Sequence, residues 1–147
     1  MKAIIFFLLV GSASLSSSLR ARRDVYQFGQ MIECLTPRSA YSDYNGYGCW
    51  CGTGGSGTPL DGTDRCCRTH DRCYDSLQNS GACGSRNLYW ESYSYSRNNC
   101  DTQSAFISCG SGDSCEVGLC QCDKTAAECF RGETFNSEYR NYNKNNC

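Results

Sequence analysis

Two adjacent residues, His70 and Asp71, combine groups suited to proton transfer and to metal binding. His70 is the only histidine of the sequence. An imidazole can act as a base near neutral pH when a carboxylate holds one ring nitrogen and the other nitrogen is free. Asp123, in a second cysteine-rich segment, can supply that carboxylate. The alternative is a structural histidine whose hydrogen bond only satisfies a buried carboxylate, which is the more common role of a lone histidine.

A glycine-rich segment at residues 47–55, YGCWCGTGG, is a candidate metal loop. Glycine tolerates positive φ, so carbonyl oxygens can turn towards one point, and calcium prefers carboxylate and carbonyl oxygens. A phosphate-binding loop and a plain turn are the alternatives, but the segment lacks the Gly-Lys-Ser/Thr ending of a P-loop. A zinc site is not favoured, because one histidine and disulfide-bonded cysteines leave too few ligands.

Helices must position these groups. Apolar residues at positions 25, 28, 31, 32 and 35 predict an amphipathic helix that Pro37 ends. Residues 36–60 are rich in Gly, Ser and Tyr and predict a loop. A second helix is expected from Asp61 or Thr63 to about Asn79. The alternation of Tyr with Ser at residues 92–96 suggests a short hairpin strand.

A last helix is expected from Ser114 to about Arg131, with Ser114 as the N-cap and Glu116 near the positive end of the helix dipole. Cysteines seven residues apart occur in both long helices, at positions 66 and 73 and at positions 122 and 129. Seven residues make two turns, so each pair shares one helical face. Antiparallel helices joined by two such disulfides would place Asp123 within about a turn of His70.

The 14 cysteines among 147 residues predict a disulfide-rich scaffold in an oxidising compartment. A basic start, an apolar run and small residues predict a signal peptide at about residues 1–18, too short to span a membrane. The basic residues that follow predict a propeptide at 19–23, so the mature domain is expected at residues 24–147. We therefore expect a secreted, extracellular protein that is made as a zymogen.

The expected mature chain is acidic. Removal of residues 1–23 takes away four basic residues, which leaves 10 basic and 15 acidic residues and a net charge of −5. This balance argues against nucleic acid as a partner. It also argues against strong attraction to anionic membranes.

Three segments together resemble the secreted phospholipase A2 family. They are YGCWCGTGG at 47–55, DRCCRTHDRCY at 64–74 and CQCDKTAAECF at 120–130. The resemblance covers essentially all of residues 24–147 and is strongest to the pancreatic and elapid-venom group. It implies a mainly α, disulfide-rich fold with an N-terminal helix, a glycine-rich calcium loop, two long antiparallel disulfide-linked helices and a small β-hairpin.

The resemblance also implies roles for matching residues. His70 would be the general base and Asp123 would orient it, supported by Tyr74 and Tyr93. One calcium ion would bind to Asp71 and to main-chain carbonyls, and the Gly52 amide would contribute to the oxyanion site. The three residues that would supply those carbonyls are Trp50, Gly52 and Gly54. Packing alone is an equal alternative for the two tyrosines.

Seven disulfides are implied by the resemblance: Cys34–Cys100, Cys49–Cys147, Cys51–Cys67, Cys66–Cys129, Cys73–Cys122, Cys83–Cys115 and Cys109–Cys120. Three features depart from the family pattern. Trp50 stands where tyrosine is usual, Arg97 stands where a cysteine is usual, and the segment from Cys83 to Tyr89 is short. The second departure makes the partner of Cys100 the least secure of the assignments.

Further side chains are candidates for contact with lipid. An interface set is expected from apolar and aromatic residues: Val25, Tyr26, Met31, Leu88, Tyr89 and Trp90. Ordinary packing is at least an equal alternative for Val25 and Met31. Tyr89 also matches a position that can contact the substrate phosphate. An acyl channel is expected from residues at helical spacing: Phe28, Ile32, Ala126, Ala127 and Phe130. Core packing would give the same spacing.

The expected activity is calcium-dependent hydrolysis of the sn-2 ester of glycerophospholipids at lipid–water interfaces, releasing a fatty acid and a lysophospholipid. The expected partner is a phospholipid aggregate or membrane surface, met by a monomer. The alternative is a venom-type toxin or receptor-binding protein on the same fold, which would have a protein receptor as its partner.

Overall fold

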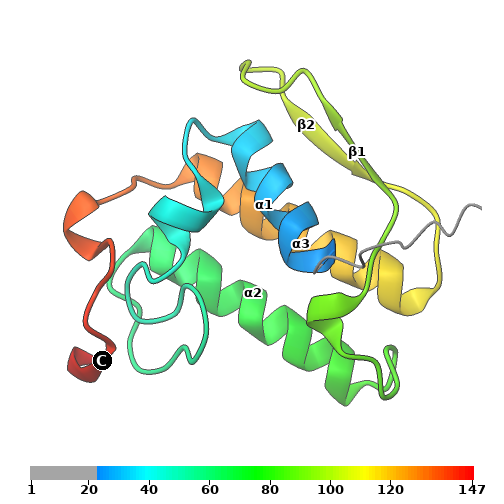
Figure 1. The fold of residues 1–147 in the computed structure, drawn as a ribbon, viewed down its shortest axis with the longest axis horizontal. Coiled ribbons are helices and arrows are strands. Elements are labelled where there is room, and N and C mark those ends of the chain that lie inside the picture. Colours follow the sequence, from blue (N-terminus) through cyan, green and yellow to red (C-terminus); the bar gives the residue numbers. More distant parts are fainter. Residues whose placement is uncertain (1–22) are drawn as a thin grey trace, which may run out of the picture.

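The computed structural model describes residues 23–147, so the expected signal peptide and all but the last residue of the expected propeptide lie outside the described residues. In this part of the chain, three α-helices and a two-stranded sheet are joined by loops and short helical turns (Figure 1). The elements are α1 (Arg23–Leu35), η1 (Ala40–Tyr44), α2 (Gly62–Asn79), η2 (Leu88–Trp90), β1 (Tyr95–Asn98), β2 (Phe106–Cys109), α3 (Ser114–Gly132), η3 (Ser137–Tyr139) and η4 (Lys144–Asn146).

The amphipathic pattern at the start of the mature domain forms α1. Its buried face carries Met31, Ile32 and Leu35, and the helix ends two residues before Pro37. The loop expected at residues 36–60 contains the short π-helical turn η1, which the sequence analysis did not predict. Ser39 explains this turn, because its hydroxyl accepts the Ser42 N–H at 3.3 Å while its own N–H donates to a nearby carboxylate.

The two long helices confirm the predicted segments, with one correction at a cap. Asp61 caps α2 by accepting the Asp64 N–H at 2.8 Å. The N-cap of α3 is Asp113 rather than Ser114. The Asp113 carboxylate reaches two free N–H groups of the first turn, and the Glu116 side chain accepts the Asp113 N–H in return at 2.9 Å.

Helices α2 and α3 run antiparallel and are joined by two disulfides, Cys66–Cys129 and Cys73–Cys122. Figure 1 shows α2, in green, crossing the molecule below α1 and α3. The hairpin projects at the top of the view, on the side opposite α2. The mainly helical, disulfide-rich class predicted from the sequence is confirmed.

The hairpin begins later than the sequence suggests. Strands β1 and β2 pair antiparallel, with Tyr95 opposite Cys109 and Asn98 opposite Phe106. Tyr93 precedes β1, so its placement in a strand is wrong. Its main chain is hydrogen-bonded to the side chain of Gln27 on α1 instead.

Disulfides close the fold, and no cysteine of the described part of the chain is free. The pairs are the seven that the resemblance implies: Cys34–Cys100, Cys49–Cys147, Cys51–Cys67, Cys66–Cys129, Cys73–Cys122, Cys83–Cys115 and Cys109–Cys120. All but Cys49–Cys147 line the core together with apolar side chains of all three α-helices. Among residues 23–147, no helix combines the length and the apolar character that a membrane span needs.

Candidate active site

The disulfide ladder between α2 and α3 brings His70 opposite Asp123. The linked Cα atoms are 5.8 and 5.7 Å apart in the two rungs. Nε2 of His70 lies 2.6 Å from Oδ1 of Asp123. Because an ionised carboxylate only accepts hydrogen bonds, Nε2 carries the proton of this bond, and in the neutral ring the lone pair lies on Nδ1.

Asp123 is fully buried and accepts two further hydrogen bonds. Tyr74 donates its hydroxyl to Oδ1 at 2.8 Å, and Tyr93 donates its hydroxyl to Oδ2 at 2.5 Å. Hydrogen bonds to an ionised acceptor are stronger than neutral ones, and a buried charge needs such partners. The three donors therefore fix the orientation of the carboxylate that holds His70.

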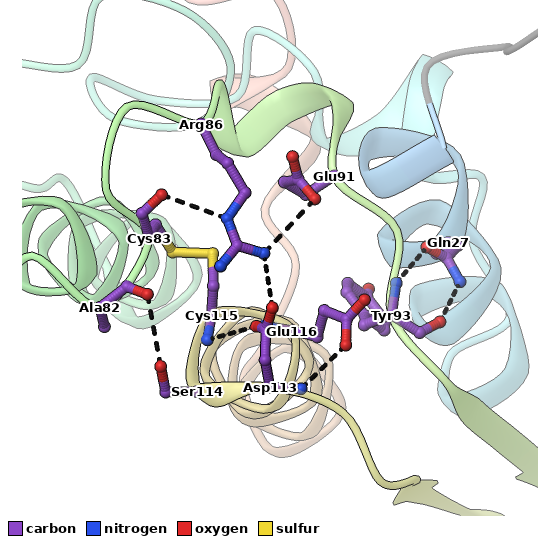
Figure 2. A network of polar contacts seen from close by, with 10 residues as sticks. All are labelled: Gln27, Ala82, Cys83, Arg86, Glu91, Tyr93, Asp113, Ser114, Cys115 and Glu116. Carbon is purple, nitrogen blue, oxygen red and sulfur yellow. Dashed lines mark hydrogen bonds and ion pairs between the residues drawn. A yellow bond between two sulfur atoms is a disulfide. The ribbon is translucent and has the colours of Figure 1, made fainter.

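A residue that the sequence analysis missed, Gln27, holds Tyr93 in place. Its Nε2 donates to the Tyr93 carbonyl at 2.7 Å, and its Oε1 accepts the Tyr93 N–H at 3.2 Å (Figure 2). One amide side chain of helix α1 thus holds the main chain of Tyr93. Nothing in the sequence pointed to this pair, because the two residues are 66 positions apart and their contact depends on the tertiary fold.

The surroundings of His70 combine an aromatic ring and a second carboxylate. The Phe28 ring stacks on the imidazole with centroids 4.4 Å apart. Nδ1 of His70 lies 3.9 Å from Oδ1 of Asp71. Burial lowers the pKa of His70, but the hydrogen bond and charge of Asp123, together with the neighbouring Asp71 carboxylate, outweigh this effect and raise the pKa to about 9.

The glycine-rich loop brings two oxygens close to Gly55. A Cβ added to Gly55 would lie 3.0 Å from Oδ2 of Asp71, 3.0 Å from the carbonyl oxygen of Trp50 and 2.8 Å from the Trp50 ring, so only glycine fits between them. Gly52 and Gly54 have φ values of 87° and 75°, which only glycine adopts readily. One carboxylate with carbonyls is the hard oxygen set that calcium prefers, so these residues fit a calcium ion.

The described part of the chain has no cluster of three or more His, Cys, Asp or Glu side chains suited to a metal. A site built on one carboxylate and main-chain oxygens does not require such a cluster of side chains. The loop is instead braced by other groups. The Trp50 indole N–H donates to the Gly57 carbonyl at 3.1 Å, and the Lys144 ammonium donates to the Thr53 carbonyl at 2.8 Å.

Comparison with known proteins identifies the family. The family model described as Phospholipase A2 matches residues 25–140. A phospholipase A2 of Bos taurus is 43% identical over 141 residues, covering 93% of this chain and 90% of its own length. One of Ovis aries is 44% identical, covering 84% and 99%, and a basic phospholipase A2 1 of Naja sagittifera is 43% identical, covering 82% and 88%.

The chain belongs to the phospholipase A2 family. It is therefore an ester hydrolase that acts on phospholipids. The resemblance to the pancreatic and elapid-venom group is confirmed by the bovine, ovine and Naja matches. Secreted members of the family act at lipid surfaces and generally depend on calcium.

In this phospholipase A2, one of the expected channel residues, Phe28, lies against the His70 ring. Phe28 is half-buried, and its ring lies 6.4 Å from that of Phe130. The buried Tyr44, which the sequence analysis missed, stacks on Phe130 with centroids 4.4 Å apart. Three further channel candidates are buried: Ile32, Ala126 and Ala127.

The expected interface residues divide into two groups. Four of them expose half or more of their surface: Val25, Tyr26, Tyr89 and Trp90. Met31 and Leu88 are buried, so their assignment to the interface is wrong. Both pack into the core because they lie on the inward faces of α1 and η2. Tyr41 is the most exposed of the large hydrophobic side chains in residues 23–147, at 81%, and was not among the candidates.

Proposed function

We propose that this phospholipase A2 hydrolyses the sn-2 ester of glycerophospholipids at lipid–water interfaces, that it requires one calcium ion, and that it releases a fatty acid and a lysophospholipid. The observation that carries the proposal is the His70–Asp123 hydrogen bond of 2.6 Å next to Asp71. The base that Asp123 orients thus stands beside Asp71, the carboxylate assigned to the metal, within one turn of α2.

His70 acts on a water molecule through Nδ1. The bond from Nε2 to Asp123 holds the ring in the tautomer whose lone pair lies on Nδ1, so Nδ1 can take a proton from water. The resulting hydroxide attacks the ester carbonyl, and when the carbonyl re-forms, the bond from the carbonyl carbon to the glycerol oxygen breaks and His70 returns its proton to that oxygen. Asp123 stabilises the imidazolium that forms, and the hydroxyls of Tyr74 and Tyr93 keep Asp123 oriented. Neither tyrosine touches the reacting atoms.

Asp71 and the carbonyls of Trp50, Gly52 and Gly54 would hold the calcium ion, which when bound supplies positive charge for the ester oxyanion and for the substrate phosphate. The Gly52 N–H donates to the same oxyanion. With a cation bound, Asp71 would pull less on the proton of His70, which favours the neutral imidazole that a base requires.

Val25, Tyr26, Tyr89 and Trp90 meet the lipid surface. Their exposure supports this role, and Tyr and Trp suit the boundary between headgroups and water. Phe28, Ile32 and Phe130 line the path of the acyl chain towards His70. With an expected mature charge of −5, we expect faster hydrolysis of zwitterionic micelles than of purely anionic vesicles.

The test is fatty-acid release from phosphatidylcholine micelles by protein that begins at Asp24, with calcium and with a chelator. Lipids labelled separately in the sn-1 and sn-2 chains report the position of cleavage. We expect sn-2 release with calcium and none with the chelator. Release from sn-1, or equal rates in the two conditions, would contradict the proposal.

The matched variant is His70→Gln, which removes the base and leaves Asp71 and the loop unchanged. Turnover should fall by about 10²-fold or more, since this is the usual contribution of a general base. Calcium binding, measured by calorimetry, should persist. A variant with nearly full activity would remove His70 from the role of base.

We further propose that the chain is secreted as a monomeric precursor with a signal peptide at 1–18 and a propeptide at 19–23. The seven disulfides support an oxidising compartment. N-terminal sequencing of protein from a eukaryotic culture medium should give Asp24. Retention inside the cells would contradict secretion.

A further inference from the structure

A buried carboxylate that the sequence analysis did not identify closes the glycine-rich loop at both ends. Asp64 lies in the first turn of α2 and is fully buried. Its Oδ1 accepts the Trp50 N–H at 2.8 Å, and its Oδ2 accepts the N–H groups of Cys49 and Leu60, each at 2.9 Å. The segment 49–60 therefore begins and ends with N–H groups that are hydrogen-bonded to the same side chain.

The main chain lies directly against this carboxylate. Gly48 has a φ of 57°, and a Cβ added there would lie 2.6 Å from each carboxylate oxygen of Asp64. Distances that short leave no room for a side chain at residue 48. The Asp64 N–H in turn donates to Oδ1 of the cap residue Asp61 at 2.8 Å. The carboxylate is thus fixed to the rigid start of α2.

Asp64 is not itself available to a metal, because both of its oxygens already accept N–H groups. Among the ion pairs of residues 23–147, none involves Asp64. Its charge is balanced by main-chain dipoles of the loop. Hydrogen bonds of this kind to a carboxylate are charge-assisted and strong.

Trp50 links Asp64 to the candidate calcium site. Its N–H is held by Asp64, while its carbonyl oxygen and Oδ2 of Asp71 both lie close to Gly55. Asp64 and Asp71 are seven residues apart, so both stand on one side of α2. One carboxylate faces the N–H groups of the loop, and the other faces its carbonyl oxygens.

We propose that Asp64 is a positioning residue that holds residues 49–60 in their calcium-binding conformation before the ion arrives, and so sets the affinity for calcium rather than the rate of the chemical step. The inference rests on the calcium requirement proposed above. Groups behind metal ligands typically change metal affinity by about 10- to 100-fold when they are replaced. The same loss is expected here, because an asparagine cannot accept all three N–H groups.

The experiment compares wild-type protein, Asp64→Asn and Asp75→Asn by titration calorimetry with calcium chloride. Asp75→Asn is the matched control, because it removes the same charge from the same helix at an exposed side chain. We expect the calcium Kd to rise roughly 10- to 100-fold in Asp64→Asn and to stay near the wild-type value in Asp75→Asn. The calcium concentration for half-maximal activity should rise by the same factor, with kcat restored at saturating calcium.

The possible outcomes distinguish failure of this inference from failure of the proposed function. Wild-type protein that binds calcium, together with an Asp64→Asn variant of equal affinity, would overturn this inference alone. Wild-type protein that binds no calcium would overturn the proposed function, and this inference with it. An Asp64→Asn variant whose kcat stays low at saturating calcium would also overturn the inference, because the residue would then act on the chemical step.

A measurement without substitution covers the case in which Asp64→Asn does not fold. Amide hydrogen exchange of the calcium-free wild-type protein reports the N–H groups of Cys49, Trp50 and Leu60. We expect these three to exchange much more slowly than neighbouring loop amides that have no acceptor. Exchange at the rate of free loop amides would overturn the inference.

Discussion

Two aspartates of α3, Asp123 and Asp113, each accept three hydrogen bonds, yet they stand in opposite surroundings. Asp123 is fully buried and is held by His70, Tyr74 and Tyr93. Asp113, the N-cap of the helix, leaves 51% of its side chain exposed. Its partners are the Arg86 guanidinium at 2.8 Å and two main-chain N–H groups at 2.9 and 3.0 Å (Figure 2).

The difference shows that burial, not the number of hydrogen bonds, decides what a carboxylate network contributes. Water can replace any partner that Asp113 loses, and salt screens its ion pair with Arg86. No water can replace a donor lost from Asp123, so the cost is the full desolvation of the group. We therefore expect the Asp123 network to control activity and the Asp113 network to affect only local structure.

The largest effect is expected from the same substitution made at both aspartates. Asp123→Asn removes the charge that stabilises the imidazolium of His70 and offers an amide N–H that can favour the wrong tautomer. Activity on phosphatidylcholine micelles at saturating calcium should fall by about 10²-fold or more. Asp113→Asn should keep nearly full activity, because asparagine caps a helix as well as aspartate does. Similar losses in the two variants would remove the distinction between the networks.

A smaller effect is expected from the tyrosines of the buried network. Tyr93→Phe removes the donor to Oδ2 of Asp123, and Tyr74→Phe removes a donor from Oδ1, which His70 also holds. A hydrogen bond to a buried charge contributes about 1.5–3 kcal/mol to stability. The free energy of unfolding, measured in guanidinium chloride with the disulfides intact, should fall by that amount in Tyr93→Phe and by less in Tyr74→Phe. The reverse order would show that the two oxygens are not held as the structure indicates.

The buried network could be predicted from the sequence to a large extent. The spacing of seven between cysteines in both long helices brought Asp123 within reach of His70, because helical geometry repeats in a known way. Residues held by main-chain contacts were not predictable. Gln27 and Asp64 bind N–H and carbonyl groups that every residue carries, so no pattern of side chains marks them.

The helix cap and the strand boundary were predicted less well. Ser114 and Asp113 are both good N-cap residues, and the choice depends on which carboxylate or hydroxyl reaches the first turn. Tyr93 reads as a strand residue because it alternates with serines, but a glutamine of α1 binds its main chain instead of a partner strand. Tertiary contacts overrode local preference in that case.

A still smaller effect is expected at Arg86. This guanidinium lies 2.8 Å from Oδ2 of Asp113 and 3.9 Å from the carboxylate of Glu91, and its Nε donates to the Cys83 carbonyl at 3.2 Å (Figure 2). Arg86→Gln should lower the melting temperature less than Tyr93→Phe does, because the ion pairs are exposed. The difference from wild type should shrink as sodium chloride is raised. A difference that is independent of salt would indicate that packing, not charge, is lost.

The smallest effect is a change in one titration. The Arg86 hydrogen bond and charge, together with the N–H groups of Glu116 and Cys115, hold the pKa of Asp113 below its ordinary value of 3.8. Because the folded protein binds this proton more weakly than the unfolded chain, the contribution to stability is present above the ordinary pKa and is lost as the pH falls through the folded pKa. Carboxyl NMR should show the pKa of Asp113 rising in Arg86→Gln, but not to 3.8, since the two N–H groups remain. An unchanged pKa would mean that the helix cap alone shifts the titration, and Arg86 would then have no electrostatic role in the exposed network.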